Sequence, residues 1–171
     1  MTLYKKFWKW YEDNYTLNAG IAAGLFLIQI IHLIWLFGEV VWFKATGTPL
    51  FTLEGIWKPI IIFVDYTEIP AILSVSLVYI NEIRKSHNVK SWLYLFFINS
   101  QWLHLFWITD EFVIQSLVTT EQTMLPLWLA WVAILIDYLE LPVIVETMKK
   151  FVQSLKEDRA KEFLAKDLKE I

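Results

Sequence analysis

The chain has 171 residues, a net charge of −3 and no cysteine, and hydrophobic residues make up 57% of it. Its mean hydropathy is +0.46, and charged residues reach only 19%, against about 25% in an average soluble domain. These values exclude an ordinary soluble domain, a disulfide-stabilised domain and a thiolate metal site. No basic, aromatic-rich patch suggests a nucleic-acid partner. We therefore expect an all-α integral membrane protein in contact with the lipid bilayer.

Four stretches are long and apolar enough to cross a bilayer, for which about 20 residues are needed. They are residues 17–43, 56–80, 91–118 and 125–148. Residues 1–16 mix aromatic side chains with lysines, which is typical of a helix lying in the membrane interface. Residues 151–171 alternate charged and apolar residues at helical spacing. This pattern predicts a cytoplasmic amphipathic tail helix.

The distribution of lysine and arginine predicts the orientation of these spans. Of 15 such residues, 13 lie in the N-terminal segment, the central loop and the C-terminal tail. Only Lys44 and Lys58 lie in the two remaining loops. Positive residues mark the cytoplasmic side, so both termini are expected in the cytoplasm.

The chain repeats its polar residues at an offset of 72 positions. The motif Q-x-x-H-L-x-W-x-x-x-E begins at Gln29 and again at Gln101, and D-Y-x-E-[IL]-P begins at Asp65 and again at Asp137. We interpret residues 17–88 and 89–150 as two copies of one two-helix unit. Each unit has an even number of spans, so both enter the membrane in the same direction. The expected fold is a four-transmembrane-helix bundle with a pseudo-two-fold axis along the membrane normal.

The repeated polar residues are expected to meet near the middle of the bilayer. His32 and Glu39 are seven residues apart and share one face of a regular helix, as do Asp65 and Glu68. From the helical rise, His32 and Glu68 should both lie about 16 Å deep. The two-fold axis adds the second copy, giving two imidazoles and six carboxylates. Buried carboxylates cost several kcal/mol unless they are paired, and no Lys or Arg lies within the four cores to compensate them.

Metal ions are the compact way to compensate this charge, because each brings two or three positive charges to one point. Imidazole with carboxylate and no thiolate suits iron, zinc or manganese. The same kinds of ligand, two His and four carboxylates, hold two ions in ferritin-like di-metal bundles, an analogy of chemistry without the Glu-x-x-His motif. We predict a site for two divalent or trivalent ions with these ligands: His32, Glu39, Asp65, Glu68, His104, Glu111, Asp137 and Glu140. Residues expected to surround and orient them are Gln29, Gln101, Tyr66, Tyr138, Trp35 and Trp107.

Pro70 and Pro142 follow the acidic pairs by two residues. A proline inside a helix removes one backbone hydrogen bond and clashes with the carbonyl four residues earlier. A kink is therefore expected beside the site, which would make room for a substrate or for the ligands.

Three function classes fit these features. The first is a di-metal membrane enzyme, an oxidoreductase or hydrolase, acting on a lipophilic small molecule. The second is a metal-cation or proton transporter that uses the same carboxylates. The third is a metal-free lipid-binding protein or isomerase in which the polar set stabilises the bundle. Association into oligomers is compatible with all three.

Overall fold

The computed structural model describes residues 2–118 and 124–167, and these form helices and their connections. In chain order the elements are α1 (Leu3–Asp13), α2 (Tyr15–Trp35), the π-helix η1 (Leu36–Val41), α3 (Trp42–Thr46), α4 (Trp57–Tyr66), α5 (Glu68–Ser86), α6 (Val89–Ile108), the π-helix η2 (Thr109–Val118), α7 (Leu127–Asp137) and α8 (Glu140–Asp167). The expected all-α fold is confirmed.

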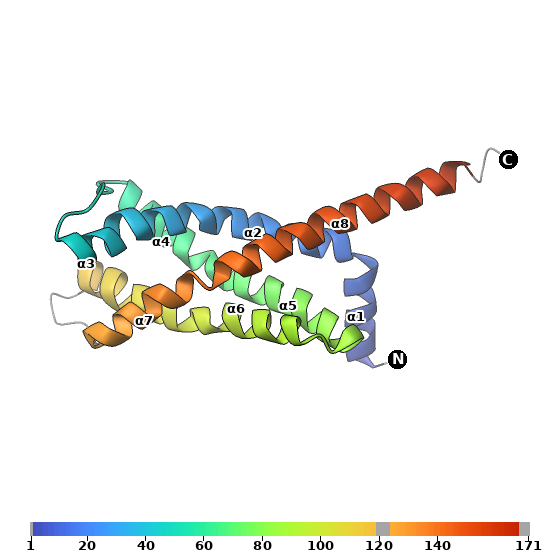
Figure 1. Ribbon diagram of the computed structural model, residues 1–171, viewed down its shortest axis with the longest axis horizontal. Coiled ribbons are helices and arrows are strands. Elements are labelled where there is room, and N and C mark those ends of the chain that lie inside the picture. Colours follow the sequence, from blue (N-terminus) through green and yellow to red (C-terminus); the bar gives the residue numbers. More distant parts are fainter. Residues whose placement is uncertain (1, 119–123, 168–171) are drawn as a thin grey trace.

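Consecutive helices join into four long helical segments, which form an elongated bundle (Figure 1). They are α2–η1–α3, α4–α5, α6–η2 and α7–α8. The α2 helix packs against α4, α5 and α8, while α6 packs against α4, α5, α7 and α8. We call the two ends of this bundle the α1 end and the α3 end.

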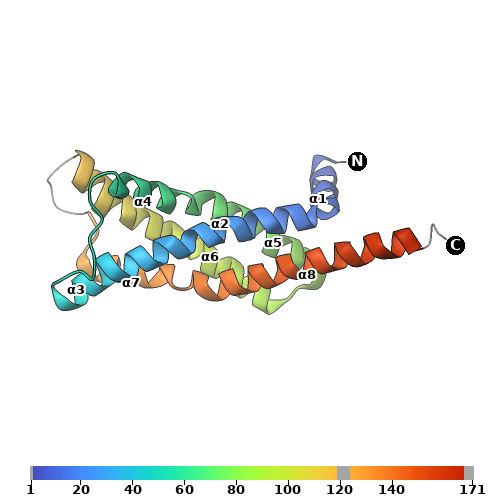
Figure 2. The same ribbon diagram turned by 90° about the horizontal axis from the view of Figure 1, so that it is seen from above.

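The α1 helix lies across one end of the bundle, and α8 continues beyond that end (Figures 1 and 2). Trp8 and Tyr11 of α1 are buried, and the Arg84 guanidinium stacks 4.0 Å from the centroid of the Trp8 ring. Leu3 and Trp10 stay exposed. That this helix lies in the membrane interface remains a prediction. The tail residues 151–167 are helical but belong to the same helix as the last span.

Within residues 2–118 and 124–167, three helices are long and apolar enough to cross a membrane: Tyr15–Thr46, Trp57–Ser86 and Leu127–Lys161. They include three of the four predicted spans. The α6 helix carries Asn99, Gln101 and His104. It is not among the helices that are apolar enough to cross a membrane. These polar side chains lower its hydropathy, so the count of four spans remains a prediction.

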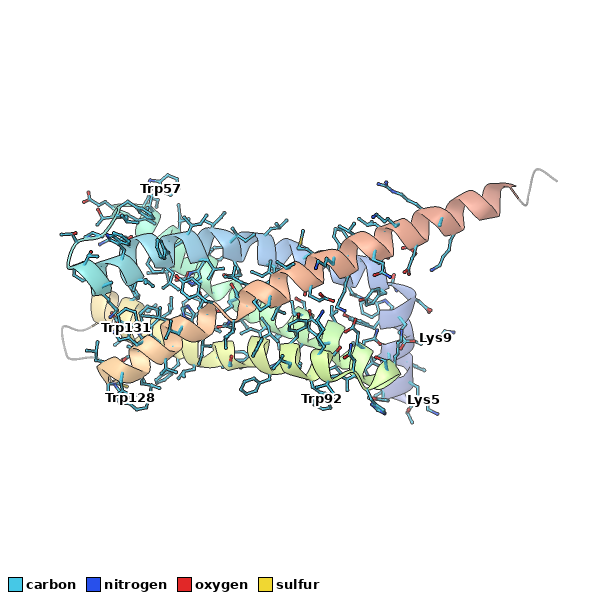
Figure 3. The ribbon with its side chains drawn as sticks, viewed as in Figure 1. Lys5, Lys9, Trp57, Trp92, Trp128 and Trp131 are labelled. Atoms are coloured by element: carbon cyan, nitrogen blue, oxygen red, sulfur yellow. The ribbon has the colours of Figure 1, made fainter. Side chains whose placement is uncertain are left out.

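Exposed tryptophans lie at both ends of the bundle (Figure 3). Trp92 lies near Lys5 and Lys9 at the α1 end, whereas Trp57 and Trp128 lie at the α3 end. All three tryptophans have more than half of their surface exposed. Tryptophan is enriched where a membrane meets water, so this distribution agrees with a bilayer surrounding the bundle.

Candidate metal centre

Two histidines from different helices meet inside the bundle. His32 comes from α2 and His104 from α6, and their ring centroids are 5.2 Å apart. Both side chains are 1% exposed or less. The Asp137 carboxylate lies between them, with Oδ2 3.2 Å from His32 Nε2 and Oδ1 3.9 Å from His104 Nε2. Ligand atoms of His32, His104 and Asp137 all lie within 4.8 Å of one another, a spacing that could hold one metal ion.

A second group consists of carboxylates only. Oxygens of Glu68, Asp137 and Glu140 also lie within 4.8 Å of one another, and all three residues are buried. Asp137 belongs to both groups. One carboxylate could therefore bridge two ions, with a histidine pair on one side and a glutamate pair on the other.

Interruptions in two helices place these carboxylates. Between α4 and α5 the helix breaks at Thr67, and between α7 and α8 it breaks at Tyr138 and Leu139. Asp65 and Asp137 precede these breaks, and Glu68 and Glu140 begin the next helices. Pro70 and Pro142 lie two residues further on, where each lacks the N–H that would continue the helical bonding. Both helices are thus interrupted beside the site, at the positions where the prolines predict a kink.

Each histidine directs its Nε2 atom toward the Asp137 carboxylate, while its Nδ1 atom contacts a different oxygen. His104 Nδ1 lies 3.2 Å from the carbonyl oxygen of Ala133, which can only accept, so this nitrogen donates and Nε2 keeps its lone pair. For His32, Nδ1 contacts the Asp65 carboxylate while Nε2 faces Asp137. Metal-binding histidines generally donate their second N–H to a carbonyl or carboxylate in this way.

Several polar atoms at the centre are buried without a hydrogen-bond partner in the described part of the chain. They are His104 Nε2, Asp137 Oδ1, Glu68 Oε1 and both carboxylate oxygens of Glu140. Orphaned buried polar atoms are rare in proteins and call for an explanation such as a bound ion. The described ion pairs include no lysine or arginine contact to these carboxylates. The donor set therefore fits a metal ion of the kind that imidazole and carboxylate bind.

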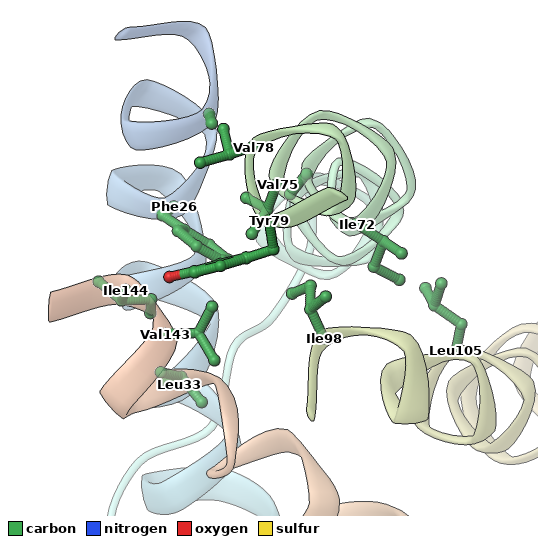
Figure 4. Packing of buried hydrophobic residues seen from close by; sticks show 12 residues of the cluster. Phe26, Leu33, Ile72, Val75, Val78, Tyr79, Ile98, Leu105, Val143 and Ile144 are labelled. Carbon is green, nitrogen blue, oxygen red and sulfur yellow. The ribbon is translucent and has the colours of Figure 1, made fainter. Parts of the chain in front are cut away.

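Apolar clusters close the site on both sides along the bundle axis. Toward the α1 end, Phe26, Ile72, Val75, Ile98 and Val143 are all fully buried (Figure 4). Toward the α3 end lies a second buried cluster that includes both ring systems beside the histidines, those of Trp35 and Trp107. The polar groups consequently lie between two buried apolar clusters and are themselves buried.

The remaining two predicted ligands, Glu39 and Glu111, lie outside both groups. Glu39 accepts hydrogen bonds from Trp35 Nε1 at 2.7 Å and from the backbone N–H of Leu53 at 3.0 Å. Glu111 accepts from Trp107 Nε1 at 2.5 Å and pairs with Lys44 Nζ at 2.8 Å. The structure places both glutamates at the α3 end of the tryptophans and does not bring them to the histidines.

The expected supporting residues occupy varied positions. Trp35 and Trp107 do flank the site, with ring centroids 5.6 and 5.4 Å from those of His32 and His104. The described hydrogen bonds of Gln29 and Gln101 do not go to the imidazoles. Their side-chain amides donate to backbone oxygens at the helix breaks, Gln29 to Val64 at 3.4 Å and Gln101 to Ile136 at 3.1 Å. These carbonyls also accept backbone N–H groups, of Thr67 and Leu139 respectively, so each glutamine adds a second donor at its helix break.

The two tyrosines differ from each other. Tyr66 shares a hydrogen bond of 2.8 Å with the Thr109 hydroxyl, and the Tyr138 hydroxyl has no partner in the described part of the chain. Neither tyrosine is in a ligand group.

Sequence reasoning gave no firm role to Asp110, which is buried and accepts hydrogen bonds from the backbone of Met124 and Leu125 at 3.1 and 3.0 Å. The available sequence signal for a role of Asp110 was that it departs from the repeated motif, since the position 72 residues earlier holds Gly38. The side chain holds the start of the segment that leads into α7.

No protein-family model, curated protein or solved structure matches the chain.

Proposed function

We propose that the protein is a membrane metalloprotein with a dinuclear His/carboxylate centre in the core of its helical bundle. The observation that carries this proposal is the position of Asp137, a carboxylate shared by two buried ligand groups. His32 and His104 would hold one ion together with Asp137, and Glu68 and Glu140 would hold the other. Asp65 would orient His32 through Nδ1. Iron, zinc and manganese are the metals that this donor set favours.

The proposal includes the interpretation of the chain as two tandem copies, residues 17–88 and 89–150, with four spans and both termini in the cytoplasm. Hydrogen bonds that recur at the same offset support it. The Gln29 and Gln101 bonds end at positions 64 and 136, and the Trp35–Glu39 bond has its equivalent in Trp107–Glu111. Both helices that carry the histidines also continue into a π-helix.

As its activity we propose an enzymatic reaction on a lipophilic small molecule. The bound metal would supply Lewis-acid or redox chemistry. The residues of the chain position it, exclude water through the two apolar clusters and hold the histidines in one tautomer. Helix interruptions beside functional carboxylates also occur in transporters, so cation transport is the second candidate. The packed layer around Phe26, Ile72 and Ile98 favours an enclosed centre over a path through the membrane.

The test is the metal content of the protein purified in mild detergent and loaded separately with Fe²⁺, Zn²⁺ or Mn²⁺. We expect about two equivalents per chain, as in di-metal helical bundles. A His32→Ala/His104→Ala double variant should lose at least one equivalent. The His87→Ala variant is the matched control, because His87 lies at the end of α5, outside both ligand groups, and it should keep the wild-type content.

Folded wild-type protein that takes up none of the three metals would overturn the proposal. Equal loss of metal in the His87→Ala control would do the same. If metal binds and also crosses the bilayer of proteoliposomes in a His32-dependent manner, the enzyme is excluded in favour of the transporter.

A further inference from the structure

A shallow groove of about 780 Å³ runs between α2 and α8 on the outside of the bundle. Its apolar lining includes Leu27 and Ile30 from α2 and Val145, Met148 and Val152 from α8. Leu27, Val145 and Val152 each expose close to half of their surface. The groove is separate from the metal-binding groups, which lie inside the bundle.

Two lysines line the same groove, Lys149 and Lys156. They are seven residues apart on α8, so they lie on one face of the helix. Neither lysine has an ion-pair or hydrogen-bond partner among the described residues. Lys150, between them in sequence, is paired with Glu82 and Glu146. The groove therefore combines an apolar floor with two positive charges at one end that form no ion pair within the described part of the chain.

The spacing of these features matches one leaflet of a bilayer. Lys149 and Lys156 lie about 14 and 24 Å along α8 from Glu140, which begins the helix at the level of the polar centre. Half of a hydrocarbon core is about 15 Å thick. If the polar centre lies near mid-membrane, the lysines reach the headgroup region while Leu27, Ile30 and Val145 lie at the depth of the acyl chains.

We propose that this groove is a binding site for one anionic phospholipid. Its acyl chain lies along α2 and α8, and its phosphate is bound by Lys149 and Lys156. Clustered lysines beside a membrane span bind anionic headgroups in this manner. The apolar lining would suit any lipid, whereas the unpaired lysines select negative charge. The site does not depend on a bound metal.

The experiment adds phosphatidylglycerol or phosphatidylcholine with identical acyl chains to the detergent-purified protein and counts retained lipids by native mass spectrometry. Wild-type protein should retain one phosphatidylglycerol in preference to phosphatidylcholine. The Lys149→Gln/Lys156→Gln variant should lose about thirtyfold of that preference. A Lys9→Gln/Lys161→Gln variant removes the same charge from exposed positions outside the groove and should keep it.

A second pair of variants tests the apolar part. Leu27→Trp fills the groove and should displace the lipid, whereas Leu73→Trp, at an exposed position on α5, should not. Equal loss of preference in both lysine variants would show attraction by net charge alone and overturn the site. Retention of phosphatidylglycerol by the Leu27→Trp variant would also overturn the site. Complete displacement of the lipid by inorganic phosphate would overturn it as well. Unchanged retention in phosphatidylcholine and unchanged helical circular dichroism exclude unfolding as the cause.

Discussion

Replacing Asp137 by asparagine is the sharpest perturbation of the proposed metal centre. The change keeps the size of the side chain but removes the charge that the two ligand groups share. Glu68 and Glu140 cannot replace it at the histidine pair, since Asp137 is the carboxylate that His32 Nε2 and His104 Nε2 face. We therefore expect Asp137→Asn to weaken the binding of both ions, whereas Glu140→Gln should weaken the binding of mainly one ion.

The magnitude follows from the loss of a direct ligand. Removing a residue that only orients a ligand costs about 10–100-fold in metal affinity, so Asp137→Asn should cost at least about 100-fold. At a metal concentration of about 1,000 times the Kd, bound metal stabilises the fold by about 4.1 kcal/mol, and a 100-fold weaker Kd reduces this to about 1.4 kcal/mol. The difference corresponds to a Tm lower by roughly 5–10 °C for a chain of this size.

The assay compares the Tm of wild type and variant in detergent, each with saturating metal and after removal of metal by chelation. The increase in Tm that metal causes should be smaller in Asp137→Asn than in wild type. Asp110→Asn is the matched control, because it changes a buried aspartate that binds backbone N–H groups outside both ligand groups. It should lower the Tm with and without metal by the same amount and keep the metal content. A metal-dependent Tm gain in Asp137→Asn equal to that of wild type would refute the reasoning.

Two further predictions concern the scaffold. Gln101→Leu should destabilise the fold by about 1–3 kcal/mol, because it removes the side-chain donor to the carbonyl of Asp137 at the helix break, while the carbonyl of Ile136 keeps the backbone N–H of Leu139; thermal unfolding with and without metal measures the cost. A Cβ at Gly38 would overlap the Phe51 ring, so Gly38→Ala should cost about 1–3 kcal/mol. Gly24→Ala meets no atom within 4 Å and should instead stabilise the helix by about 0.5–1 kcal/mol; equal Tm values for the two glycine variants would contradict this packing.

The sequence predicts most of the fold because its hydrophobic runs are long. The first, second and fourth predicted spans correspond to the membrane-length helices Tyr15–Thr46, Trp57–Ser86 and Leu127–Lys161. Their C-terminal ends extend beyond the apolar runs, since a helix continues until a breaker stops it and not where hydropathy falls. The continuous helix from Glu140 to Asp167 is an example, because no glycine or proline separates the last span from its tail.

Six of the eight predicted ligands are at the candidate centre or in contact with it, and the other two, Glu39 and Glu111, bind the tryptophans instead. Glu39 was expected on the face of His32 because seven residues make nearly two turns of a regular α-helix. The π-helix η1 begins at Leu36, between these two residues. Its wider turns, with bonds from i to i+5, turn Glu39 away toward Trp35 and Leu53. Single-chain hydropathy contains no signal for a π-helix, so this shift could not be foreseen.

Under the proposed interpretation of the chain as two copies, residues 17–88 and 89–150, the differences between the copies indicate which polar contacts the proposed centre requires. At the α3 end the contacts of the two copies differ. Glu39 accepts a hydrogen bond from the Leu53 backbone. In the second copy Asp110 accepts the bond from the Leu125 backbone, and Glu111 pairs with Lys44. At the helix breaks the Gln–carbonyl bonds recur in both copies. Contacts also recur at the α3 end, where Trp107–Glu111 is the equivalent of Trp35–Glu39. What distinguishes the helix breaks is that oxygens of Asp137, Glu68 and Glu140 beside them are buried without a hydrogen-bond partner in the described part of the chain. Such groups persist at the cost of their desolvation when they serve a ligand.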